Sequence, residues 1–115
     1  MKKGLFLAAF LGLFPPFQSA MAHDVVMHLY VVADEIEGEV GYAGGDMVPY
    51  ARVDILDEDM NRIGAVATDD KGQFTFKPTK CITHTFRANL GAGHVIAKEV
   101  IKDDLPTSLA GCHAN

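Results

Sequence analysis

The chain has 115 residues and is acidic, with 15 Asp and Glu against 10 Lys and Arg and a formal net charge of −5 at pH 7. Nucleic acid and anionic membrane surfaces are therefore poor partners, whereas cations or a basic protein surface suit this charge. A chain of this length forms one small domain, whose modest core would benefit from an additional covalent link.

The first 22 residues are organised like a cleavable secretory signal. Lys2 and Lys3 supply positive charge, residues 4–14 are apolar, and residues 20–22 (AMA) have the small-x-small form that signal peptidase accepts. The apolar run is shorter than the ~20 residues that a membrane span needs, so a retained anchor is the less favoured alternative. We therefore expect export to the periplasm.

Cleavage after this segment divides the chain into three predicted parts. Residues 1–22 are the signal peptide, residues 23–106 a β-sandwich domain, and residues 107–115 a tail without hydrophobic periodicity. His23 would then be the first residue of the mature protein.

Seven segments alternate apolar and polar residues with the two-residue period of β-strands. Segment 25–33 is apolar on both faces, which predicts a strand inside a sheet and not at an edge. Segments 51–55, 63–67 and 74–76 are joined by short polar turns, which predicts an antiparallel meander covered by a second sheet. The pattern indicates an all-β fold, a seven-stranded antiparallel β-sandwich. The expected strands are 25–33, 36–42, 51–55, 63–67, 74–76, 82–90 and 95–101.

The apolar face of each strand predicts which side chains lie between the two sheets. In segment 63–67 this face carries Ile63, Ala65 and Ala67, and in segment 82–90 it includes His84. The principal core members are expected to be Leu29, Val53, Ile55, Phe74, Phe76 and Phe86.

Cys81 and Cys112 have two interpretations. An even number of cysteines in an exported chain favours a disulfide, which would fasten the tail to the domain. The alternative makes both cysteines thiolate metal ligands, together with the neighbouring His84 and His113. The oxidising compartment favours the disulfide.

His23 carries the strongest chemical signal. A free N-terminal histidine offers its α-amine and its imidazole Nδ1 to one metal ion, and the amine becomes available near neutral pH when a metal competes for it. Two nitrogen ligands suit Ni²⁺, Co²⁺ and above all Cu²⁺. The alternative is that His23 merely follows a cleavage site.

Three further histidines are candidate metal ligands with weaker signals. His94 ranks first because it follows a Gly-Ala-Gly turn at a sheet rim, where functional residues concentrate. His28 lies on the strand face opposite Met27, and His84 lies on an apolar strand face. A single strand histidine is more often a structural residue than a ligand.

No nucleophile elbow or phosphate-binding glycine loop is visible, so we expect no enzyme and no small organic substrate.

The middle of the chain resembles the carboxypeptidase-regulatory-like, transthyretin-type β-sandwich. Residues 48–55 (VPYARVDI) place a proline before an A-x-V strand, and residues 68–76 (TDDKGQFTF) match the T-D-x-x-G-x-F-x-F turn of that family. This resemblance implies the fold and leaves activity open, because the sandwich carries many functions.

A wider set of motifs resembles the periplasmic accessory component of nickel and cobalt energy-coupling-factor transporters. The set comprises an N-terminal histidine, residues 37–42 (EGEVGY), the T-D-x-x-G-x-F-x-F turn and residues 91–94 (GAGH). Val95 follows where that family usually has arginine. The resemblance implies a domain beside a membrane permease that assists uptake of nickel or cobalt, with His23 and His94 at the matching positions.

The sequence is therefore compatible with three functions. The favoured one is an exported metal-binding domain that assists a nickel or cobalt permease. The alternatives are a periplasmic copper-binding protein with the same N-terminal site, and an envelope structural or adhesive module without metal.

Overall fold

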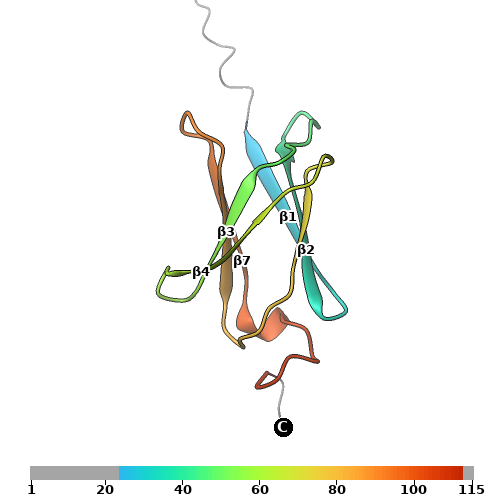
Figure 1. Ribbon diagram of the computed structural model, residues 1–115, viewed down its shortest axis with the longest axis vertical. Helices are drawn as coiled ribbons and strands as arrows, with labels where there is room; N and C mark the ends of the chain where they lie inside the picture. The colour runs from blue at the N-terminus through green and yellow to red at the C-terminus, as the bar shows by residue number, and fades with distance from the viewer. Residues whose placement is uncertain (1–23, 113–115) are drawn as a thin grey trace, which may run out of the picture.

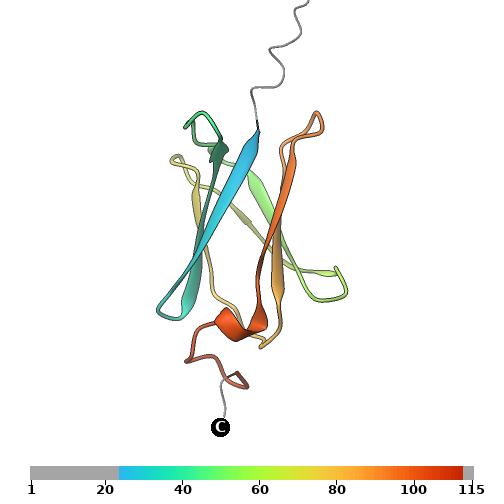
Figure 2. The ribbon, with the colours of Figure 1, turned by 180° about the vertical axis from the view of Figure 1, so that it is seen from behind.

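The computed structural model describes residues 24–112, which fold into two antiparallel sheets packed face to face (Figures 1 and 2). The three-stranded sheet has the order β1-β2-β5 and the four-stranded sheet the order β4-β3-β6-β7. The predicted all-β sandwich is thereby confirmed. The elements are β1 (Val25–Val32), β2 (Glu35–Tyr42), β3 (Arg52–Leu56), β4 (Arg62–Ala67), β5 (Gln73–Phe76), β6 (His84–Asn89), β7 (Val95–Val100) and the short 3₁₀ helix η2 (Lys102–Asp104).

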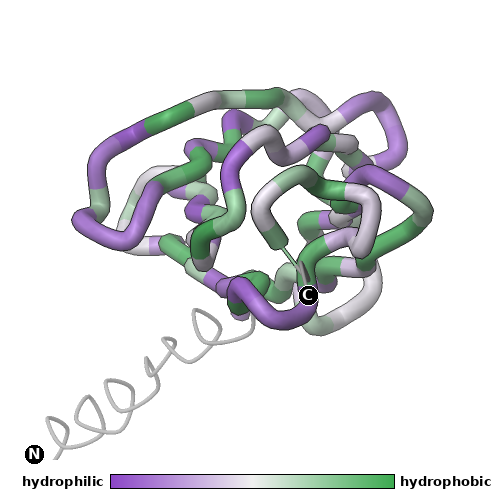
Figure 3. Tube along the Cα trace, turned by 90° about the horizontal axis from the view of Figure 1, so that it is seen from below, coloured by the Kyte–Doolittle hydropathy of each residue, from purple (hydrophilic) through white to green (hydrophobic). Residues whose placement is uncertain are grey.

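The core lies between the sheets and contains most of the side chains that strand alternation predicted. Hydrophobic and hydrophilic positions alternate along the chain when the sandwich is seen end-on (Figure 3). Val53, Ile55 and Phe86 are inaccessible to solvent, and Phe74 is almost so. Leu29 and Phe76 are only half-buried, although both pack against this core.

The predicted meander is wrong in one respect, because its third strand belongs to the other sheet. β5 pairs with β2, not with β4, and places Phe74 opposite Gly38. A Cβ atom at Gly38 would lie 2.2 Å from Cζ of Phe74. Because Gly38 has no side chain, the Phe74 ring packs over its backbone, and this contact favours the pairing of β5 with β2.

The predicted interior position of the first strand is also wrong. β1 is an edge strand of the three-stranded sheet and leaves Tyr30, Val31 and Val32 exposed. Its inner face is covered because β1 packs across the sandwich against β7, the edge strand of the other sheet. The apolar residues of β1 are therefore not all buried. Some pack inside the sandwich, whereas those near the end of the strand are exposed to solvent.

The predicted inner face of the fourth strand is shifted. A bulge changes the pairing register between Ile55 and Leu56, and beyond it Val53 pairs with Val66. Val66 consequently packs against the core, whereas Ala65 and Ala67 are exposed. Sequence alternation alone did not reveal the bulge. The extra residue of a bulge changes the face on which the later side chains of a strand lie.

Thr68 and Gly72 of the T-D-x-x-G motif shape the loops at one end of the sandwich. The buried Thr68 hydroxyl accepts a hydrogen bond from the Ala51 backbone N–H and donates one to the Val48 carbonyl, both at 2.7 Å. Gly72 has a φ of 78°, a conformation that glycine adopts readily. The motif therefore specifies the geometry of the turn before β5.

The sandwich has two distinct ends. The end that we call the N-terminal rim is formed by Asp24 and the β2–β3, β4–β5 and β6–β7 connections (Figure 1). The opposite end, the tail end, carries the β1–β2 and β3–β4 turns and the segment around η2. No helix among residues 24–112 has the length and apolar character required to cross a membrane.

Candidate functional site

The N-terminal rim brings the start of the described chain beside the end of β2. Val25 pairs with Tyr42, and the Asp24 carbonyl accepts a hydrogen bond of 2.8 Å from the Ala43 backbone N–H. Asp24 is the covalent neighbour of His23, which itself lies outside the described residues. The position next to the predicted mature N-terminus is thus fixed to this rim.

His94 lies at the same rim, on the turn between β6 and β7. Its N–H donates to the Gly91 carbonyl at 2.9 Å, and its own carbonyl accepts from the Leu90 N–H at 2.8 Å. Three residues of the turn have a positive φ, with values of 86° at Gly91, 53° at Ala92 and 82° at Gly93. The predicted hairpin turn is therefore present and ends at His94.

The Tyr42 ring connects the two sheets at this rim. Its centroid lies 6.5 Å from that of the half-buried His94 ring, with the planes at 85°. Tyr42 belongs to β2 and pairs with Val25 of β1, so this ring contact joins the β1–β2 pair to the β6–β7 turn. An edge-to-face contact of this kind orients the imidazole without using its ring nitrogens for a strong hydrogen bond.

His28 lies away from this pair, on the outer face of the three-stranded sheet. It is exposed and is directly opposite Glu39 on β2. Within residues 24–112, no three His, Cys, Asp or Glu side chains are close enough together to hold a metal ion. The structure therefore does not bring His28, His84 and His94 together.

His84 lies in the core at the start of β6, at the tail end. It is inaccessible to solvent and packs against Phe76 and Phe86, with ring centroids 5.8 and 6.4 Å away. Its Nδ1 lies 2.8 Å from the Ile82 carbonyl, so Nδ1 carries the proton and donates it. Nε2 is buried and has no hydrogen-bond partner among the described atoms. His84 is thus separated both from solvent and from His94.

Burial lowers the pKa of His84, because a charged imidazolium would lose its hydration in the core. The Ile82 carbonyl and the more distant Glu58 carboxylate oppose this shift without cancelling it. His84 is therefore neutral in the folded protein near pH 7.

This shift predicts a pH dependence of stability. The unfolded chain binds a proton at His84 more readily than the folded chain, so the stabilisation is complete above about pH 6.5 and declines as the pH falls. As the pH falls from 7 towards 5, the free energy of unfolding should therefore decline because of this group. Urea titrations at several pH values should show a shallower decline for His84→Leu. A wild-type slope in that variant would contradict the assignment.

Cys81 and Cys112 form a disulfide, with their Cα atoms 5.3 Å apart. The predicted disulfide is confirmed, and the alternative of two thiolate metal ligands is wrong; no cysteine of the described chain is free. The bridge holds the tail against the core, where Leu105 and Leu109 also pack.

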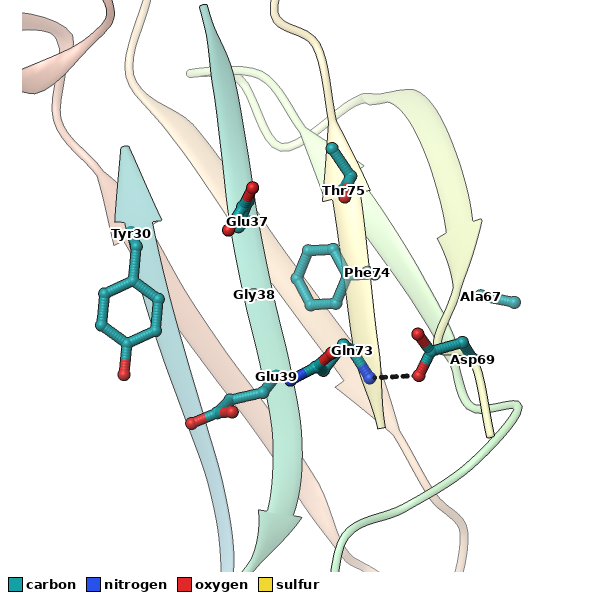
Figure 4. Close-up of a pocket in the computed structure, with 9 residues that line it drawn as sticks. All are labelled: Tyr30, Glu37, Gly38, Glu39, Ala67, Asp69, Gln73, Phe74 and Thr75. Carbon is teal, nitrogen blue, oxygen red and sulfur yellow. Dashed lines mark hydrogen bonds between the residues drawn. The ribbon is translucent and has the colours of Figure 1, made fainter. Parts of the chain in front are cut away.

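The outer face of the three-stranded sheet is acidic. A groove of about 470 Å³ crosses it and is lined by Tyr30 and the carboxylates of Glu37, Glu39 and Asp69 (Figure 4). Backbone N–H groups of Gln73 and Lys71 donate to Asp69, at 2.9 and 2.8 Å, and lower the pKa of that carboxyl. Asp69 thus stabilises its turn. The other carboxylates give this face a negative charge that suits cations or a basic partner.

A pocket beside this groove contains a residue that sequence reasoning missed. His28, Glu39 and Met47 line it together, although Met47 lies in the β2–β3 loop and carries no metal-ligand motif in the sequence. Gly41 was the available signal, because a glycine within a strand often marks close approach of another chain segment.

Comparison with protein-family models, curated proteins and solved structures gives no match to this chain.

Proposed function

We propose that this chain is an exported accessory domain that binds divalent nickel or cobalt at the N-terminal rim and assists uptake by a membrane permease. The observation that carries the proposal is the placement of Asp24 and His94 at one rim, linked through Tyr42. Asp24 directly follows His23 in the chain, so the described residue next to His23 lies at the same rim as His94.

The ligand set would comprise the His23 amine, the His23 imidazole and the His94 imidazole. Three nitrogen ligands suit Ni²⁺ and Co²⁺, and Cu²⁺ would compete for the same site. A site at the rim would leave the metal accessible for transfer to a partner. The acidic outer face supports the proposal because it raises the local concentration of cations.

Calorimetric titration with Ni²⁺ tests the proposal on the chain that begins at His23. One glycine added before His23 converts the amine to an amide and should weaken binding at least tenfold, or about 1.4 kcal/mol. His23→Ala should weaken binding at least as much, and His94→Ala should have a smaller effect.

His113→Ala is the matched control and should bind Ni²⁺ like the wild type. If the glycine-extended chain binds as tightly as the wild type, the N-terminal chelate is wrong. Absence of binding of Ni²⁺, Co²⁺ and Cu²⁺ to the wild type would instead favour an envelope module without metal.

A further inference from the structure

The pocket on the outer face beside the acidic groove combines three chemically different ligands. We call it the outer pocket; it has a volume of about 360 Å³ and is lined by His28, Glu39 and Met47. These residues come from β1, β2 and the β2–β3 loop. Their convergence depends on the fold, since Met47 is distant in sequence from His28.

Strand pairing places the imidazole beside the carboxylate. His28 and Glu39 are directly opposite each other in the antiparallel pair of β1 and β2, and their side chains share the outer face. Cross-strand partners have Cβ atoms about 4.5–5.5 Å apart, which lets both side chains reach one ion.

Gly41 brings the thioether to the same place. Met47 forms an isolated β-bridge with Gly41, and a Cβ atom at Gly41 would lie only 3.1 Å from the Met47 Sδ atom. Gly41 is two residues after Glu39, so its missing side chain would also lie on the outer face. The Met47 sulfur therefore lies over bare backbone beside Glu39 and remains part of an open pocket.

The chemistry of this set favours one metal. A thioether is a soft ligand that selects Cu(I) over Ni²⁺, Co²⁺ and Zn²⁺, and imidazole also binds copper well. A carboxylate beside them offsets the positive charge of the ion. We propose that the outer pocket is a Cu(I) site, with His28 and Met47 as ligands and Glu39 as the neighbouring charge. This site uses none of the residues proposed for nickel or cobalt at the N-terminal rim.

The test is anaerobic competition for Cu(I) between the protein and bicinchoninate, followed by the absorbance of the copper–bicinchoninate complex. Met47→Leu keeps the size of the side chain and removes the sulfur, so it should weaken Cu(I) binding at least tenfold. His28→Gln should do the same. X-ray absorption of the wild-type complex should show a copper–sulfur contribution that Met47→Leu loses.

Met60→Leu is the matched control, because Met60 is an exposed methionine on the β3–β4 turn at the tail end. It should bind Cu(I) like the wild type, and so should His23→Ala. Equal affinity of the Met47→Leu and wild-type proteins would overturn the proposal, as would loss of Cu(I) binding in His23→Ala. Circular dichroism of each variant identifies any loss of folding.

Discussion

Replacing Phe86 by alanine should lower the free energy of unfolding by about 3–5 kcal/mol, because the side chain is fully buried and its removal leaves a cavity. The Phe86 ring lies 5.9 Å from the rings of both Phe74 and Phe76 and connects β6 with the opposite sheet. Those aromatic contacts would be lost together with the buried area. Equilibrium unfolding in urea, monitored by circular dichroism, measures the change.

Phe76→Ala provides the comparison within the same cluster. Phe76 is only half-buried, so its truncation should cost less than that of Phe86. Phe86→Leu keeps most of the volume and should also cost less than Phe86→Ala. A loss below about 1 kcal/mol for Phe86→Ala would show that this ring does not fill the inter-sheet core.

Removing the disulfide should lower the free energy of unfolding by about 3–4 kcal/mol in the chain-entropy model. The bridge joins residues 31 positions apart and restricts a long loop of the unfolded chain. Cys112 is buried, so Cys81→Ala/Cys112→Ala avoids placing a hydroxyl group in the core. Urea unfolding of this double variant beside the oxidised wild type gives the difference.

The reduced wild type is the control for this second experiment. It should unfold at nearly the same urea concentration as the double variant, since both lack the cross-link. Thiol titration of the oxidised, unfolded wild type should find no free thiol. Equal midpoints for the oxidised and reduced proteins would show that the bridge contributes no stability.

Local sequence pattern predicted the strands and most of the core. Val53, Ile55 and Phe86 alternate with polar residues, and this period translates directly into an inner and an outer face. The pattern could not predict which strands pair when they are not consecutive in the sequence. The exchange of β5 into the other sheet depends on the fit between Phe74 and Gly38, residues far apart in sequence.

The candidate sites were predictable only where a single residue carries the signal. His94 follows a turn whose glycines are visible in the sequence, and the turn is present in the fold. The buried position of His84 follows from its neighbours on the apolar face. The outer pocket was not predictable, because Met47 lines it beside His28 only as a result of the bridge between Met47 and Gly41.

The N-terminal rim and the disulfide lie at opposite ends of the domain, so the two ends differ in chemistry. The start of β1 and the β6–β7 turn lie at one end of the sandwich, whereas the segment that follows η2 and ends in the Cys81–Cys112 bridge lies at the other (Figure 2). Any protein bound at the tail end would therefore lie at the opposite end of the sandwich from His94 and would leave the N-terminal rim uncovered.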